Sequence, residues 1–467
     1  MEDERNVGEP TTQEYVVKNR LQATDGPIHG WYRFILGYPP HLVREYLDIF
    51  QCDPEKDWIF DPFCGTATTP VEARLLGFPT MSTDANPISV LAAKVKLNWD
   101  LDLNQITSLL GDILDLAARC LSRYDLASIP NENLQLSLFG SNLLSGRVKY
   151  GNGGNELTSE FQPNRILLPA SASLIPTGFI SEKPLLRVLA MRYAIENIMS
   201  EQNQCDFFKL ALANTIVKSA GNVGFGPEVY RLPPKEDADV LGEFSLMVYR
   251  MVDDLRMVIE KQALPYPPAY MFSDDARTLS RLKETLSIGA VITSPPYPNE
   301  KDYTRTTRLE SVLLGLINTK SDLRTLKNNL LRSNTRNVFI SDDDDRFIKD
   351  IPSVLSVADE IERKRVELGK TSGFERLYHR VTRLYFGGMY RHLKSLIVFL
   401  RPGAHCAYVV GDQMSYFRVH IRTASLLADV AIKAGYEVEG IQLWRTRRST
   451  ATKLDLEENV LILKRPG

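Results

Sequence analysis

Short apolar runs that end in polar residues recur along this chain and predict the strands of a buried sheet. The apolar runs occupy residues 58–60, 269–272, 289–292 and 405–410, and the more polar stretch 78–83, which ends at Asp84, predicts a further strand. Apolar runs of this length, bounded by turn residues, are typical of strands that are covered on both faces. Helical segments separate them, so the pattern predicts an α/β fold with a doubly wound sheet. Two further runs, 437–444 and 459–463, lie too close together for a crossover and predict a terminal antiparallel pair.

Apolar residues three and four apart predict the helices that accompany these strands. The helical segments are residues 41–50, 88–99, 106–124, 185–199, 207–219, 243–261 and 374–399. We predict that residues 101–265 are a large, mainly helical insertion with a Gly-, Ser- and Asn-rich loop at 134–164. Residues 26–100 and 266–467 are then the two parts of the main domain, after a polar lead-in at 1–25.

The run 289–292 ends in Thr293-Ser294-Pro295-Pro296-Tyr297, a turn that carries candidate chemistry. Two consecutive prolines fix two φ angles, push Ser294 into an extended conformation and leave rigid carbonyl acceptors. Ser294 adds a hydroxyl group, and Tyr297 adds a flat ring on which a planar molecule can stack. An exocyclic amine of a nucleobase suits this set of groups. The alternative interpretation is a purely structural strand cap, with Tyr297 in the core.

Two earlier strand tips also carry residues suited to a ligand. The run 58–60 is followed by Asp61-Pro62-Phe63-Cys64-Gly65-Thr66 and then by a helix. Backbone N–H groups at such a junction favour a polar or anionic ligand, and Gly65 permits its close approach. About twenty residues further on, Asp84 ends the second strand, where a carboxylate can accept hydrogen bonds from ribose hydroxyls. Asp84 is equally suited to cap the helix that begins at Pro87.

Composition narrows the class of protein without identifying it. The 467 residues allow two or three domains, or one Rossmann-like core with large insertions. Lys and Arg number 56 against 58 Asp and Glu, so any surface for a polyanion must be local. Five scattered cysteines show no metal-ligand or redox spacing, which favours a reducing, intracellular protein without structural zinc. Without a secretory signal or a bilayer-spanning run, we expect a cytoplasmic protein that does not bind a membrane.

Four motifs in a consistent order, DPFCGT (61–66), DANP (84–87), DDAR (274–277) and TSPPY (293–297), resemble those of amino-group DNA methyltransferases. The segment HGWYRF (29–34), followed by YPP (38–40), is similar to the cofactor-proximal segment of that family. The resemblance covers residues 29–100 and 268–465. It implies a Rossmann-like methyltransferase sheet, S-adenosylmethionine as the cofactor and DNA as the partner. Where such an enzyme is half of a restriction-modification pair, a cognate restriction endonuclease is a further partner.

The resemblance also implies roles for individual residues. The methionine part of the cofactor would contact Asp61, Phe63, Gly65 and Thr66. Asp84 would hold the ribose, Asp275 would hold the adenine amine, and the expected cofactor site further includes Trp31, Tyr32 and Asn86. For Trp31 and Tyr32, a place in the core is the alternative. The target base would be held by Ser294, Pro295, Pro296 and Tyr297.

The first residue of the last motif separates two subclasses of the family. Aspartate or asparagine before the prolines is usual for adenine N6 enzymes and serine for cytosine N4 enzymes, so Ser294 favours N4-cytosine. Adenine N6 methylation, methylation of RNA or of a protein amide, and a catalytically silent DNA-binding subunit stay open as alternatives. Ala67 departs from the family pattern, because a second glycine is common there.

Charge is locally unbalanced just after the TSPPY motif. Residues 301–337 contain eight Lys or Arg against three acidic residues, and such a stretch is suited to grip phosphates. We therefore expect residues 301–375 to include a DNA-contacting insertion. The acidic run 342–345 predicts an exposed loop, and the basic residues 445–449 predict a connector between the last two strands.

Overall fold

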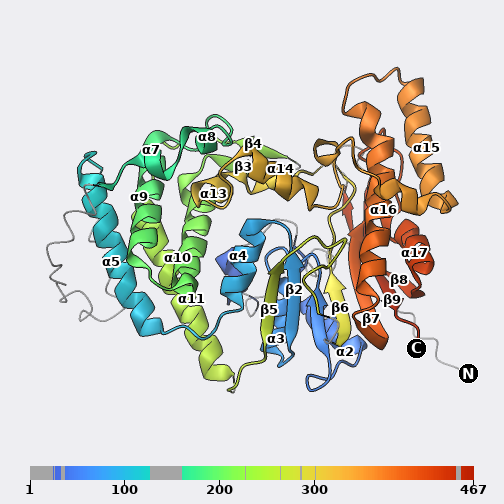
Figure 1. Ribbon diagram of the computed structural model, residues 1–467, viewed down its shortest axis with the longest axis horizontal. Coiled ribbons are helices and arrows are strands. Elements are labelled where there is room, and N and C mark those ends of the chain that lie inside the picture. Colours follow the sequence, from blue (N-terminus) through green and yellow to red (C-terminus); the bar gives the residue numbers. More distant parts are fainter. Residues whose placement is uncertain are drawn as a thin grey trace, which may run out of the picture.

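The computed structural model describes residues 25, 27–32, 37–126, 160–226, 228–262, 264–283, 287–299, 301–448 and 454–467. The lead-in 1–24 and most of the predicted loop 134–164 lie outside these residues. A seven-stranded sheet with the order β5-β2-β1-β6-β7-β9-β8 is its centre (Figure 1). The strands are β1 Trp58–Asp61, β2 Thr80–Asp84, β5 Ala269–Ser273, β6 Ile288–Thr293, β7 Leu400–Gly411, β8 Glu437–Arg448 and β9 Asp455–Lys464.

Strands β5, β2, β1, β6 and β7 pair in parallel, whereas β9 is antiparallel to both β7 and β8. The predicted α/β fold with a terminal antiparallel pair is therefore confirmed. Two details of the prediction were wrong. Pro402 and Gly403, which were expected to form a turn, lie within β7. Arg445–Arg448, which were expected in the connector, lie within β8, because the hairpin pairing extends to Arg448 and Asp455.

Alternation along the strands divides the core between the two faces of the sheet. Ala407 and Val409 of β7 face the helix α2 (Pro40–Ile49), together with Ile292 of β6. Cys406 and Tyr408, which alternate with them along β7, pack on the other face in a second cluster with α16 (Tyr378–Leu396) and α17 (Thr423–Ala434). Successive strand residues point to opposite faces, so a sheet covered on both sides reads as continuous apolar runs. This is why the strands were recognisable from the sequence.

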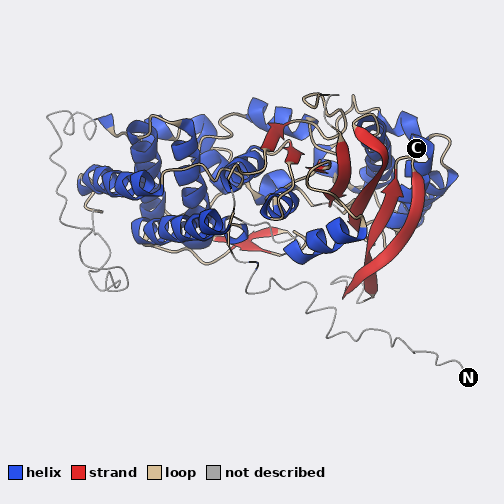
Figure 2. Cartoon of the chain, turned by 90° about the horizontal axis from the view of Figure 1, so that it is seen from below, coloured by secondary structure: helices blue, strands red, loops and turns tan. Residues whose placement is uncertain are grey.

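A group of helices lies beside the β5 edge of the sheet (Figures 1 and 2). It comprises α5 Leu103–Ser122, α7 Pro163–Ile166, α8 Pro169–Ala172, α9 Glu182–Ile198, α10 Gln202–Thr215, the π-helical turn η4 Ile216–Ala220 and α11 Val240–Lys261, with a small hairpin of β3 Val223–Phe225 and β4 Val229–Arg231. Its core is continuous with α4 (Pro87–Lys96) and with the segment 28–32, including η2 (His29–Trp31). Among the described residues, no helix is both long and apolar enough to cross a membrane.

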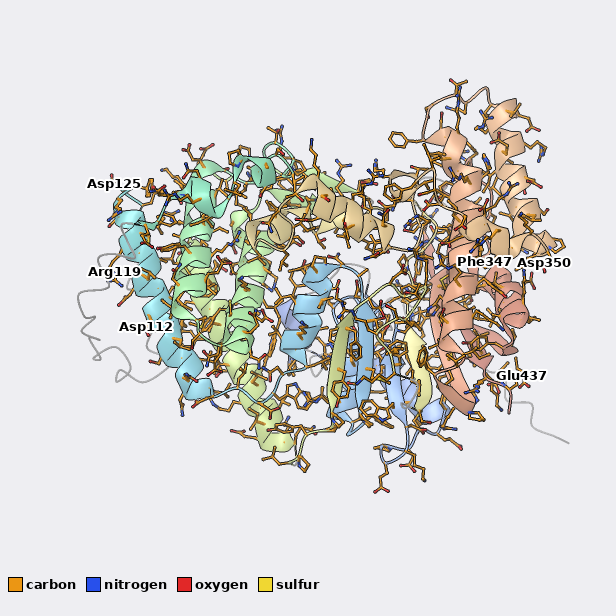
Figure 3. All side chains as sticks on the ribbon, viewed as in Figure 1. Asp112, Arg119, Asp125, Phe347, Asp350 and Glu437 are labelled. Atoms are coloured by element: carbon orange, nitrogen blue, oxygen red, sulfur yellow. The ribbon has the colours of Figure 1, made fainter. Side chains whose placement is uncertain are left out.

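The chain between β6 and β7 crosses the carboxyl ends of the parallel strands and then covers the sheet (Figure 1). Its elements are α12 Tyr303–Thr306, α13 Arg308–Leu313, α14 Lys320–Asn328, η5 Thr335–Asn337, η6 Asp344–Ile348, α15 Pro352–Glu367, η7 Glu375–Leu377 and α16. Lys433 of α17 donates to the Phe347 carbonyl at 2.5 Å and pairs with Asp350, which fastens η6 to this layer (Figure 3). Near the start of the chain, helix α3 (Thr68–Leu75) follows β1.

The acidic run 342–345 is not simply an exposed loop, as the sequence suggested. Asp344 is 3% exposed and accepts hydrogen bonds from Arg277 at 3.0 Å and from Arg391 at 2.6 Å. Gly387 of α16 allows this, because a Cβ there would stand 1.9 Å from the Asp344 carbonyl oxygen. A buried carboxylate is retained only when it is paired. The acidic run therefore contributes to packing against α16.

Candidate active site

The Thr293–Tyr297 turn lies between two neighbouring strand ends and is bonded to both. The Thr293 hydroxyl donates to Asp61 Oδ1 at 2.6 Å, which joins the turn to the end of β1. The Ser294 hydroxyl donates to the Val409 carbonyl of β7 at 3.0 Å. The Tyr297 hydroxyl is a second, more distant acceptor for the same proton at 3.5 Å. When the proton lies on the shorter bond to Val409, the oxygen of Ser294 is left as an acceptor. Pro295 is buried, and Pro296 is half-buried.

Tyr297 is held by a residue that the sequence did not indicate. Tyr297 is 8% exposed and belongs to the core cluster of the α16 face, as the alternative interpretation expected, and its hydroxyl donates to Glu458 Oε1 at 2.7 Å. Glu458 also pairs with Arg445 across the β8–β9 hairpin. Burial raises the pKa of Tyr297, so the phenol stays protonated and keeps donating. Glu458 lay just outside the predicted strand 459–463, and no sequence pattern gave the hairpin register that brings it to Arg445.

The Asp61–Thr66 turn takes an unusual backbone course before α3 begins. Gly65 has φ 49° and Ala67 has φ 70°, so both occupy the left-handed region. Glycine adopts this conformation at no steric cost, whereas alanine pays roughly 1–2 kcal/mol. Ala67 thus occupies a position that glycine fits better, which agrees with the departure noted in the sequence. The Gly65 N–H donates to Asp84 Oδ2 at 2.9 Å, so the two strand tips are joined.

Asp84 serves the tip of β2 and is not the cap of α4. The cap is Asn86, whose side-chain oxygen accepts from the Ile88 N–H at 3.4 Å. Asp84 Oδ1 instead accepts from the Asn86 N–H at 2.8 Å. The cap interpretation of Asp84 was therefore wrong. Burial raises the pKa of Asp84 to about 6, although hydrogen bonds from the backbone N–H groups of Asn86, Gly65 and Ala85 oppose the shift. Of roughly four lone-pair sites on the carboxylate, at least one remains for a ligand.

Asp61 lies behind the loop. It is 0% exposed and accepts hydrogen bonds from the Phe63 N–H at 3.1 Å, from Thr293 and from the Tyr38 hydroxyl at 2.9 Å. Burial raises the pKa of Asp61 to about 7. Phe63 is half-buried, with its ring at 4.9 Å from that of His392. Asp61 therefore fixes the positions of the Phe63 backbone and Thr293. Tyr38, the first residue of the YPP segment, contacts Asp61 although it was not among the expected cofactor residues.

A buried lysine ties the aromatic segment to the loop. Lys96 of α4 is 1% exposed and donates to the carbonyls of Tyr32 at 2.7 Å, Thr66 at 2.8 Å and His29 at 3.3 Å. The Tyr32 hydroxyl donates to Glu310 of α13 at 2.5 Å. Burial raises the pKa of Glu310 to about 7. The backbones of Tyr32 and Thr66 are therefore joined through one donor. No sequence signal indicated this role of Lys96, because a lysine in a helix normally indicates a solvated face.

Trp31 packs into the helical region. It is 0% exposed, its indole N–H donates to Asp254 of α11 at 2.8 Å, and its ring makes an edge contact with Phe207 of α10. Its carbonyl accepts from Asn214 at 2.6 Å. The core alternative thus describes its side chain.

Asp275, just beyond β5, is engaged by a neighbouring arginine. Arg277 donates to both of its carboxylate oxygens, the shortest contact being 2.7 Å, and also pairs with Asp344. The carboxylate keeps lone pairs for one more donor. The Asp274 N–H donates to the Asp84 carbonyl at 3.1 Å, so the tips of β5 and β2 are adjacent. Asp275 therefore lies near Asp84 with its orientation set by Arg277.

Much of the basic excess in residues 301–337 is used within the protein. Arg332 is buried and forms two 2.8 Å hydrogen bonds with Asp342, and Lys327 pairs with Asp302 at 3.5 Å. Arg305 and Arg336 both pair with Glu228, and the exposed basic residues of the segment include Lys320 and Arg324. The positive surface is therefore smaller than the sequence suggests.

The strand order and the groups gathered at the carboxyl edge define a Rossmann-like methyltransferase fold. The chain is similar to the Type II methyltransferase M.BsoBI of Geobacillus stearothermophilus, at 23% identity over 295 residues, which are 62% of this chain and 53% of that protein. It is also similar to the Type II methyltransferase M.MvaI of Kocuria varians, at 22% identity over 321 residues, which are 65% and 61% of the two chains. The chain thus spans between about half and about three fifths of these relatives. No family model matches it.

Proposed function

We propose that this chain is a site-specific DNA methyltransferase that moves a methyl group from S-adenosylmethionine to the exocyclic N4 amine of cytosine. The observation that carries the proposal is the orientation of Ser294. Its shortest hydrogen bond donates the proton to the Val409 carbonyl at 3.0 Å, which leaves the oxygen free to accept a hydrogen bond from the amine of a base. The Thr293–Asp61 hydrogen bond sets this acceptor beside the loop proposed to hold the cofactor. The two similar Type II methyltransferases support the same reaction class.

The residues at the strand tips fit S-adenosylmethionine. Asp84 retains carboxylate lone pairs for the ribose hydroxyls, and Asp275 retains them for the adenine amine. The left-handed Gly65 brings backbone close to a ligand, with Phe63 and Thr66 on either side, while Asp61 holds their conformation. The Tyr32 and Thr66 carbonyls share Lys96 as a donor, whereas Trp31 is fixed by Asn214 in the helical region and Asn86 caps α4. When bound, the cofactor supplies an electrophilic methyl group on a sulfonium.

The protein groups at the turn would orient the amine. The lone pair of an aryl amine is delocalised into the ring, which makes the amine a poor nucleophile. If the Ser294 oxygen and the Pro295 carbonyl accept its N–H bonds, the lone pair turns out of the ring plane, and this arrangement favours the transition state over the ground state. The base must leave the duplex to reach the turn, at a cost of a few kcal/mol. Stacking on Tyr297, with Pro296 beside it, offsets part of that cost.

Nucleoside mass spectrometry tests the proposal. DNA incubated with the purified chain and S-adenosylmethionine should contain N4-methylcytosine, and DNA incubated with Ser294→Ala should contain much less. Cofactor binding by Ser294→Ala, measured by calorimetry, should stay unchanged, because Ser294 belongs to the base site. N6-methyladenine as the product would refute the choice of base, and methylation of RNA or protein in place of DNA would refute the substrate.

A further inference from the structure

A tight turn between α14 and α15 displays an isoleucine to solvent. In the turn Phe339–Asp342 the Asp342 N–H donates to the Phe339 carbonyl at 3.2 Å, and Ile340 is the first residue of its tip. The Ile340 side chain is 98% exposed, whereas Leu264, another highly exposed apolar side chain of the described residues, reaches 76%. Turn tips favour Gly, Pro, Asn and Asp. Folding therefore gains nothing from an apolar side chain at this position.

Two arginines hold this turn rigidly. Arg380 of α16 donates to the carbonyls of Phe339 at 3.1 Å, Ile340 at 3.2 Å and Asp342 at 3.2 Å. Arg332 forms two hydrogen bonds with the Asp342 carboxylate, which also accepts from the Phe339 N–H at 2.7 Å. A turn with all these groups satisfied pays little entropy when a partner binds Ile340.

The turn belongs to the same segment as the base-binding residues. The Asn299 N–H, two residues after Tyr297, donates to the Ser333 carbonyl at 3.2 Å. Asn334 in turn donates to the Lys301 carbonyl at 3.1 Å. Ile340 therefore lies six residues after Asn334, which contacts the chain four residues beyond Tyr297. The exposed Arg324 lies over the Phe339 ring at 5.7 Å, so a cation suited to a phosphate flanks the tip.

We propose that Ile340 inserts into the base stack of duplex DNA and fills the space that the target base leaves when it turns out. The inference rests on the proposed function, because only a base leaving its duplex creates such a space. Isoleucine is among the apolar side chains that proteins insert between base steps. Such an inserted side chain lowers the free-energy cost of opening a paired base. It gives no advantage where the base is already unpaired, because that cost is then absent.

The test compares paired and unpaired targets. Sequencing of plasmid DNA methylated by the wild-type protein gives the recognition site, from which two duplexes are made. One has the target base paired, and the other has a mismatch opposite it. The variants are Ile340→Ala, Ile340→Leu and the control Ile432→Ala, which truncates an isoleucine 60% exposed on α17. Both isoleucine side chains are mostly exposed and have little packing to lose, so all three variants should unfold at the same temperature as the wild-type protein.

We expect Ile340→Ala to lower kcat/KM roughly tenfold on the paired duplex, about 1.4 kcal/mol, and to stay within about twofold of the wild type on the mismatched one. Ile340→Leu and Ile432→Ala should match the wild type on both. An Ile340→Ala variant that loses activity equally on the two duplexes, or on neither, overturns the proposal while the methyltransferase function stands. A wild-type protein that methylates no DNA overturns both.

Discussion

Removing a single oxygen from Tyr297 separates the two roles that its side chain can have. Tyr297→Phe keeps the ring and therefore the face on which a base would stack. It removes the hydroxyl that donates to Glu458 at 2.7 Å. If stacking alone matters, the substitution is silent. If the hydroxyl fixes the ring, the substitution costs stability and slows methyl transfer together.

The expected magnitude follows from the surroundings of the lost hydrogen bond. A hydrogen bond to a charged group contributes about 1.5–3 kcal/mol. Glu458 keeps its pairing with Arg445, so the carboxylate is not left buried without a partner. The loss should lie at the lower end, about 1.5 kcal/mol of unfolding free energy. Methyl transfer should fall roughly tenfold, because an equal loss of transition-state stabilisation has that effect.

A double-mutant cycle provides the assay. Tyr297→Phe, Glu458→Ala and the double variant are compared by urea unfolding and by transfer of a labelled methyl group to DNA. The two single effects should overlap by about 0.5–1.5 kcal/mol, because both remove the same contact. Strictly additive effects, or a Tyr297→Phe protein that unfolds and transfers like the wild type, would refute the idea that Glu458 positions Tyr297.

Three further predictions concern other parts of the site. Asp84→Ala should weaken S-adenosylmethionine binding in calorimetry. The affinity of the wild-type protein should fall as the pH drops through about 6, because the raised pKa of Asp84 lets the carboxylate protonate there, and Asp84→Asn should remove that part of the pH dependence. Lys96→Met leaves three buried carbonyls without their donor and should cost about 2–4 kcal/mol in urea unfolding, whereas the exposed Lys94→Met on the same helix should cost under about 0.5 kcal/mol. Gly411→Ala would bring a Cβ to 3.0 Å from Tyr297 Cε2 and should slow methyl transfer by displacing the ring, with unaltered cofactor binding as the control.

The strands and their tips were predictable because strands that are buried on both faces give short, mainly apolar runs in the sequence. The runs before Asp61 and Ser294 are mostly apolar, the run before Asp84 is buried although it contains Thr80, Ser82 and Thr83, and parallel strands must bring their carboxyl ends to one edge. Predicting that these tips are neighbours therefore needed no knowledge of side-chain contacts. The same reasoning failed at Pro402 and Arg445, because turn residues and charges are also tolerated near the ends of long strands.

The supporting contacts were not predictable, because each depends on register or on a charge whose partner is distant. Glu458 and Arg445 meet only when the hairpin pairs in one register, and a shift by one residue would point both side chains to the other face. Lys96 is buried because three carbonyls converge on it, although lysine is among the residues least often buried. Arg332 contributes to the basic excess of residues 301–337, whereas its partner Asp342 lies outside that stretch, and together they fix the turn that displays Ile340.

The Thr293–Tyr297 turn is stiff for a reason beyond its two prolines. Its first residue is bonded to Asp61, and its last is bonded to Glu458, partners that lie 232 and 161 residues away in the chain. The first contact spans to the loop proposed to hold the cofactor, and the second spans to the β8–β9 hairpin. Because both ends are held, a displacement of the hairpin would move Tyr297 relative to Asp61. The terminal hairpin therefore acts as part of the site, and substitutions at Arg445 should change methyl transfer more than the exposure of that side chain would suggest.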